Sequence, residues 1–116
     1  MTLFVEPVAK PRMTRSDKWK RRPCVTRYRA YKDELRDLRA PSGTQLALVF
    51  RLTMPASWPR AKRDKHRGQP HQAKPDVDNL VKGYLDAVLA DDSTVWRVTA
   101  EKRWADAGSI TVEAMP

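Results

Sequence analysis

The sequence predicts a single α/β domain over residues 1–116, with a mixed β-sheet of about four strands packed with two main helices. At 116 residues the chain can close one modest hydrophobic core but not two. Apolar residues alternate with polar ones in some stretches, as in half-buried strands, and recur every three or four residues in others, as in amphipathic helices. Elements of both kinds along one chain are typical of the α/β class.

The first three expected elements are a strand, a helix and a second strand. Residues 2–7 are apolar and β-branched, and this strand should end at Pro7. Residues 24–40 repeat apolar positions near helical spacing, with a proline just beyond. Residues 44–54 alternate strictly and give the clearest strand. The residues expected on its inward face are Leu46, Leu48, Phe50, Leu52 and Met54.

A second helix and two further strands complete the pattern. Residues 76–90 carry apolar side chains at intervals of three and four, which predicts a helix packed on the sheet. Residues 93–105 and 109–115 alternate, and the intervening "DAGS" suits a hairpin turn. The expected order is therefore strand, helix, strand, helix, strand, strand.

The chain is strongly basic, with a formal charge of +9 and a pI near 10.1, which favours a polyanionic partner such as nucleic acid. Most of this charge falls in residues 10–23 and 55–75, which we interpret as polar loops that are either functional or disordered without a ligand. The single Cys24 agrees with a reducing compartment, and no apolar stretch is long enough to span a membrane, so we expect a cytoplasmic protein. The candidate DNA contacts are Arg12, Arg15, Lys18, Lys20, Arg60, Lys62, Arg63 and Lys74.

Against this basic background, five of the fourteen acids fall between positions 76 and 92. Pro75 favours an extended entry to the helix, so Asp76 and Asp78 can converge where extended chain turns helical. Asp78 and Lys82 share one helix face at i, i+4 spacing. Asp91 and Asp92 lie about 20 Å away if the helix is straight. They join the cluster only if the chain turns back or the helix ends early.

Converging carboxylates repel one another, and a divalent cation resolves that conflict. Oxygen ligands without nearby His or Cys suit Mg²⁺ or Mn²⁺ rather than zinc. Such a cation can polarise a phosphodiester and activate water, and Lys82 can neutralise charge on the phosphate.

Each of these residues also has an ordinary structural interpretation. Asp76 is well placed to cap the helix, and Asp78 and Lys82 can form a surface ion pair worth about 0.5 kcal/mol. Asp91 and Asp92 can form a turn. The basic loops can be solvated charge without a ligand.

Two stretches, "KPDVDNLVKGYLDAVL" and "DDSTVWRVTAEK", closely resemble the signature of the RusA family of Holliday junction resolvases, found in bacteria, on prophages and in phages. The amino-terminal "EPVAKPRMTRSDKW" and "TRYRAYKDELR" are also similar to that family's opening. The signature fixes many positions at set spacings, so it is far more specific than a short motif. The resemblance implies a RusA-like fold and a homodimer that cuts paired strands of a four-way DNA junction.

The resemblance also implies roles for single residues. The family's Mg²⁺-binding carboxylates fall on Asp76, Asp78 and Asp92, and its catalytic lysine falls on Lys82. No membrane and no organic cofactor is implied. Further family positions, with less defined roles, are matched by Asn79, Asp86, Asp91 and Lys102.

One departure concerns the connection "DAVLADD", which is shorter than in many relatives and leaves open whether Asp91 or Asp92 is the third ligand. The spacing from the pair to Lys102 favours Asp92. Two other functions remain open: a basic DNA-binding protein without catalysis, and a nuclease that cuts a broader range of branched DNA.

Overall fold

The computed structural model describes residues 1–12 and 23–115, and the element order of these residues follows the predicted alternation of strands and helices. The expected positions Arg15, Lys18 and Lys20 lie outside the described residues. The elements are β1 (Thr2–Leu3), α1 (Pro23–Asp37), β2 (Gln45–Thr53), α2 (Arg60–His66), α3 (Val77–Val88), the 3-10 helix η2 (Asp92–Thr94), β3 (Arg97–Ala105) and β4 (Ser109–Met115).

The strands form one four-stranded mixed sheet in the order β1-β4-β2-β3. β2 pairs in parallel with β3, from Gln45 opposite Arg97 to Thr53 opposite Ala105, and antiparallel with β4. The predicted hairpin of the last two strands is therefore wrong, because β3 and β4 each pair with β2, which lies between them. The alternation predicted for β2 is confirmed, because every second side chain is buried. The buried residues of β2 are Leu46, Leu48, Phe50 and Leu52.

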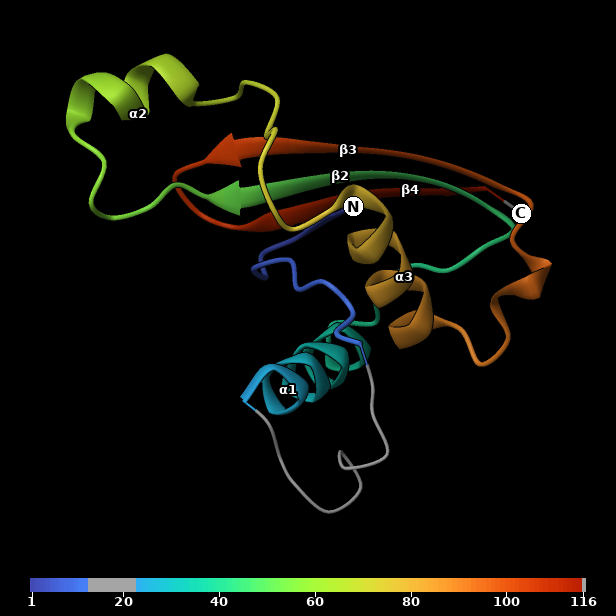
Figure 1. Cartoon of the computed structure of the whole chain (residues 1–116). Helices are drawn as coiled ribbons and strands as arrows, with labels where there is room; N and C mark the ends of the chain where they lie inside the picture. Colours follow the sequence, from blue (N-terminus) through green and yellow to red (C-terminus); the bar gives the residue numbers. More distant parts are fainter. Residues whose placement is uncertain (13–22, 116) are drawn as a thin grey trace.

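Helices α1 and α3 lie on the same face of the sheet and enclose the hydrophobic core against it (Figure 1). α1 contributes Tyr28 and Leu35, and α3 contributes Leu80 and Tyr84, all at most 1% exposed. The predicted α/β class with two main helices is therefore confirmed. Among the described residues, no helix has the length and apolar character needed to cross a bilayer.

Two predicted strands have different bounds. β1 ends at Leu3 rather than at Pro7, because only Thr2 and Leu3 pair with β4. β3 begins at Arg97, since the preceding residues form η2 and a connection. Trp96, just before the strand, is 68% exposed.

The largest correction concerns residues 55–75, predicted to be a loop, which contain the helix α2. Trp58 holds this helix to the sheet, since its ring packs against His66 at 4.9 Å and Trp104 at 4.8 Å between ring centres. The Arg63 guanidinium donates to the carbonyls of Pro55 and Trp58 at 2.9 and 3.2 Å. Few apolar side chains are needed because one tryptophan and one arginine hold the segment.

After α2 the chain returns along the outer edge of β3. Gly68 donates its backbone N–H to the Trp104 carbonyl at 2.9 Å, and His71 donates to the Lys102 carbonyl at 3.0 Å. Gly68 has φ of 78°, a left-handed conformation that favours glycine. Arg67 adds a two-pronged ion pair to Asp106, at 2.7 and 3.0 Å, in the turn between β3 and β4. This edge pairing carries the chain to the start of α3.

Candidate active site at the start of α3

The segment that leads into α3 is fixed to the sheet by Lys102 of β3. The Lys102 Nζ donates to the carbonyl of Ala73 at 2.6 Å and to that of Pro75 at 2.7 Å. The Lys74–Pro75 peptide between these carbonyls is cis. Because Asp76 follows directly, Lys102 fixes the position of the Asp76 backbone relative to the sheet.

Asp76 occupies the N-cap position of α3 in an extended conformation, with φ of −69° and ψ of 142°. The sequence therefore predicted correctly that the chain enters the helix extended and turns helical after Asp76. The Asp76 side chain nevertheless makes no capping hydrogen bond. N-capping usually depends on such a bond to the backbone of the first turn. The Asp76 carboxylate is thus exposed and caps no backbone N–H of α3.

Asp78 lies in the first turn of α3 and points along the helix surface to Lys82. The Asp78 Oδ2 and Lys82 Nζ are 3.8 Å apart, and both side chains are more than 60% exposed. An ion pair this exposed contributes at most about 1 kcal/mol. The start of α3 therefore presents two carboxylates and one ammonium group that contribute little to the fold. These oxygen donors suit Mg²⁺ or Mn²⁺.

Asp91 and Asp92 lie beyond the far end of α3, and the structure does not bring them to Asp76 within one chain. The twelve residues of α3 span about 18 Å between the two places. Figure 1 shows η2 at the end of α3 opposite to its start. Among the described residues, no group of three or more His, Cys, Asp or Glu side chains is placed to hold a metal ion. The chain does turn back, but β3 carries Lys102, not the aspartate pair, to the start of the helix.

The two neighbouring aspartates differ in their surroundings. The Asp91 side chain accepts a hydrogen bond from the Ser93 backbone N–H at 3.0 Å, which caps η2 and lowers the pKa of Asp91. Asp92 is exposed, and its carboxylate has no hydrogen bond or ion pair to a described residue. The turn interpretation therefore holds for Asp91, whereas Asp92 keeps its carboxylate available.

Asp86 has a structural role between the two helices. Its carboxylate accepts a hydrogen bond from the Tyr28 hydroxyl at 2.7 Å and pairs with Lys32 at 3.1 Å and Lys10 at 3.8 Å. Burial alone would raise the pKa of Asp86, but the hydrogen bonds from Tyr28 and Lys32 outweigh it, so the pKa is lowered. Asp86 thus ties α1 and the amino-terminal segment to α3. Asn79, another residue that matches a family position, accepts a hydrogen bond at its backbone carbonyl from the Lys10 N–H at 3.1 Å.

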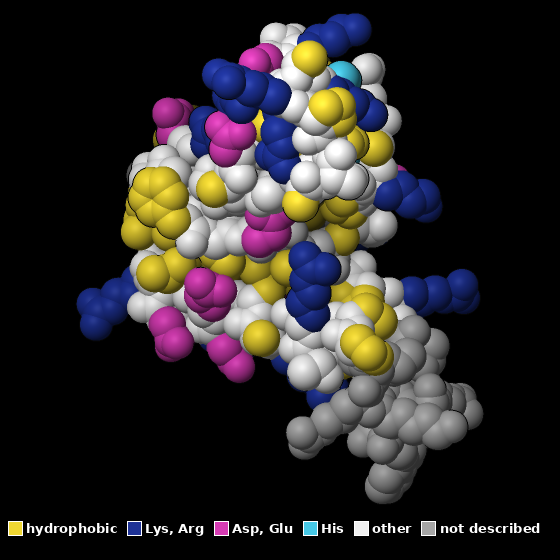
Figure 2. All heavy atoms as spheres, turned by 90° about the vertical axis from the view of Figure 1, so that its left-hand side faces the viewer, with side chains coloured by type: hydrophobic (Ala, Val, Ile, Leu, Met, Phe, Trp, Pro, Cys, Tyr) yellow, Lys and Arg dark blue, Asp and Glu magenta, His cyan; other side chains and the backbone are white. Residues whose placement is uncertain are grey.

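The basic residues of α2, together with Arg67 just after it, differ in how firmly they are bound to the protein. Arg63 and Arg67 are bound to carbonyls and carboxylates of the protein, as described above. Arg60 is 96% exposed at its side chain and makes only a long ion pair, at 3.9 Å, with Asp64 of its own helix, and Lys62 lies over the Trp58 ring at 4.3 Å from its centre. Lys and Arg side chains gather at the top of Figure 2, the part of the molecule that carries α2. Of the predicted DNA contacts on this helix, Arg60 and Lys62 are better placed than Arg63. Lys65, on the same helix, is also exposed.

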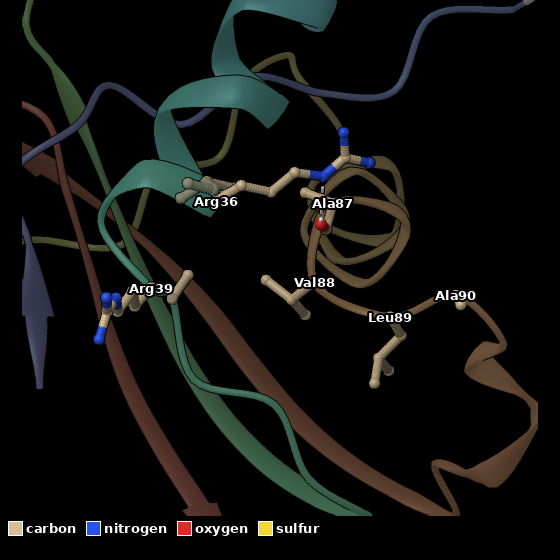
Figure 3. Close-up of a pocket in the computed structure, with 8 residues that line it drawn as sticks. Arg36, Arg39, Ala87, Val88, Leu89 and Ala90 are labelled. Carbon is tan, nitrogen blue, oxygen red and sulfur yellow. Dashed lines mark hydrogen bonds between the residues drawn. The ribbon is translucent and has the colours of Figure 1, made fainter.

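A separate hollow of about 380 Å³ lies where α1 and α3 end, away from Asp76. In Figure 3 the Arg36 side chain reaches across to Ala87, whose carbonyl accepts a hydrogen bond from the Arg36 Nε at 3.3 Å, while Arg39 points away from α3. The rest of the lining is mostly apolar and carries no carboxylate. This hollow therefore joins two helix ends and offers no groups for phosphodiester chemistry.

A comparison with protein-family models matches residues 5–115 to the family described as Endodeoxyribonuclease RusA. The match covers nearly the whole chain, including the start of α3 and the strand that carries Lys102. The four-stranded mixed sheet with its helices is consistent with the RusA fold. No curated protein and no solved structure matches the chain.

These observations first define a class, a small basic α/β protein with exposed carboxylates at a helix start. The family comparison makes it specific: the chain belongs to the RusA family of endodeoxyribonucleases, enzymes of Holliday junction resolution.

Proposed function

We propose that this protein is a metal-dependent endonuclease that resolves four-way DNA junctions by hydrolysing phosphodiesters in paired strands. The observation that carries the proposal is the start of α3. There Lys102 fixes the backbone before Asp76, and Asp76 and Asp78 expose carboxylates that have no large structural role. In a chain of net charge +9, exposed carboxylates on a fixed backbone are best explained by a cation that they hold at the DNA.

The chain's own residues would divide the work as follows. Asp76 and Asp78 would hold the divalent cation, Mg²⁺ with Mn²⁺ as a substitute. The bound cation would polarise the phosphodiester and activate the attacking water. Once Asp78 faces a cation, the Lys82 ammonium loses its partner at 3.8 Å and can neutralise the charge that builds on the phosphate. Arg60, Lys62 and Lys74 would hold other parts of the DNA backbone, which positions the substrate without reading its sequence.

The third proposed ligand, Asp92, requires a second copy of the chain. Within one chain, the length of α3 separates Asp92 from Asp76. A homodimer with two-fold symmetry can place the η2 of one copy beside the α3 start of the other. The symmetry then repeats this contact at the second site. Each dimer would then have two equivalent sites, as paired cutting of two strands demands. We therefore propose that Asp92 acts on the site of the partner copy.

The test of the function is cleavage of a labelled four-way junction and of a linear duplex with the same arm sequences, in Mg²⁺ and in EDTA. We expect paired, symmetric nicks in the junction, none in the duplex, and none in EDTA. Cutting of flaps and forks at the same rate would indicate a broader branched-DNA nuclease. Junction binding without any cutting in Mg²⁺ or Mn²⁺ would favour a non-catalytic DNA-binding protein.

A further inference from the structure

The amino-terminal segment and the first turns of α3 form a basic groove beside Lys82. The groove has a volume of about 300 Å³. It is lined by Lys10, Pro11, Arg12, Asn79 and Lys82. Three of these five residues carry a positive charge, and they come from two elements that are far apart in the sequence.

The groove is held in place by the close approach of the two elements. The Lys10 backbone N–H donates to the Asn79 carbonyl at 3.1 Å. Gly83 allows this contact, because a Cβ there would lie 2.8 Å from the Val8 carbonyl oxygen and 3.2 Å from the Lys10 nitrogen. A larger residue at position 83 would push the segment off the helix. The position of Lys10 is thus a property of the fold.

The groove keeps a net positive charge despite the nearby carboxylates. Asp86 pairs with Lys10 at 3.8 Å, but it also pairs with Lys32 at the shorter distance of 3.1 Å. One carboxylate therefore serves two ammonium groups, and a positive charge remains. To the described residues, Lys82 makes one ion pair, the exposed one with Asp78, which a cation at Asp78 would weaken. A concave surface with excess positive charge favours a compact anion.

We propose that this groove binds a backbone phosphate of the DNA strand being cut, next to the phosphate that is hydrolysed. This proposal rests on the proposed nuclease function. Lys82 lines the groove and also pairs with Asp78. A phosphate bound in the groove would therefore be separated from the carboxylates by the Lys82 side chain alone. The groove positions the strand and does not take part in the chemical step. Lys10 is the phosphate contact that this geometry adds to the site.

The test measures junction binding without cutting, in an Asp76→Asn background over a series of salt concentrations. Lys10→Gln is compared with Lys32→Gln. Both variants remove one ion pair from Asp86, but only Lys10 lines the groove. We expect Lys10→Gln to weaken binding several-fold and to reduce the slope of log affinity against log salt by about 0.9, the value for one phosphate contact. Lys32→Gln should lower the affinity less and leave the slope unchanged, because it shifts Asp86 onto Lys10 but removes no residue that lines the groove. Lys10→Arg should restore both values.

Three results would overturn the proposal. Equal affinities and equal slopes for Lys10→Gln and Lys32→Gln would show that the groove does not contact DNA, and would leave the nuclease function intact. A weaker affinity with an unchanged slope would show a loss through the fold. Failure of the Asp76→Asn parent to bind a junction even at low salt would remove the proposed function and, with it, this phosphate site.

Discussion

Two sets of aspartates on α3 differ sharply in what holds them. Asp86, in the third turn, touches a tyrosine hydroxyl and two lysines from other elements. Asp76 and Asp78, at the start, make one ion pair to the part of the chain that the structure describes: the exposed pair of Asp78 with Lys82 at 3.8 Å. All three carboxylates lie within eleven residues, yet only Asp86 joins parts of the fold.

The difference separates stability from activity along one helix. A carboxylate with three partners contributes to folding, and its loss should be felt in the free energy of unfolding. Exposed carboxylates on a fixed backbone contribute little to folding, and their mutual repulsion slightly opposes it. Residues of that kind are typical of functional sites, where activity is retained at some expense of stability.

The largest expected effect is that of Asp78→Asn on junction cutting. We expect the rate to fall at least about a hundredfold, because a metal ligand supports several kcal/mol of transition-state stabilisation. The matched control is Asp33→Asn, since Asp33 is also exposed and pairs with Arg36 in its own helix at 3.9 Å. Both variants should unfold at the wild-type temperature. Equal cutting by the two variants would remove Asp78 from the site.

A smaller effect is expected for Lys102, whose Nζ donates to two backbone carbonyls just before Asp76. Lys102→Met removes the donor to the Ala73 and Pro75 carbonyls. We expect about a tenfold to hundredfold loss of cutting, the range for residues that orient metal ligands. More Mg²⁺ should be needed for half-maximal activity, while junction affinity in EDTA stays the same. Lys102→Arg should recover part of the activity. An unchanged Mg²⁺ requirement in Lys102→Met would contradict the positioning role.

The smallest effect on cutting, and the largest on stability, is expected for Asp86→Asn. We expect a loss of about 1 to 2 kcal/mol in the free energy of unfolding at pH 7, since charged hydrogen bonds contribute about 1.5 to 3 kcal/mol and this carboxylate is partly screened by water. Cutting by the folded variant should change little.

The same network predicts a pH dependence. The pKa of Asp86 is lowered in the folded protein from its usual 3.8. The stability from its ion pairs is therefore present above pH 3.8 and is lost as pH falls below it. Chemical denaturation at pH 7 and pH 3 should show the difference between wild type and Asp86→Asn shrinking in acid. A constant difference would mean that the carboxylate charge is not what ties the helices.

Much of this arrangement could be predicted from local sequence. Pro75 predicts the extended entry, and the apolar repeat predicts the helix α3. The length of that helix already indicated that Asp92 lies too far from Asp76 to join it within one chain. Lys102 could be placed on a strand, but not opposite Phe50 and beside Pro75, because register depends on pairing with a distant strand. The family resemblance, and not the residue pattern, singled out Lys102 in advance.

The helix α2 could not be predicted, because its stability comes from contacts distant in sequence. Trp58 packs on Trp104, forty-six positions later, and Arg67 pairs with Asp106. Apolar periodicity detects a helix that buries a stripe of side chains, and α2 has no buried residue. The position of Lys10 beside Asn79 could not be predicted for a similar reason, since it depends on the close approach of the amino-terminal segment to Gly83.

The most direct test of the account is complementation between two inactive variants, Asp76→Asn and Asp92→Asn, assayed alone and after co-expression as a mixed dimer. If Asp92 serves the site of the other copy, each mixed dimer has one site with all its carboxylates. Its other site lacks both Asp76 and Asp92. We predict that each variant alone is inactive and that the mixture regains about a quarter of the wild-type sites, with nicks in one strand rather than paired cuts. A mixture as inactive as its components, or an Asp92→Asn protein that cuts like wild type, would contradict the shared site.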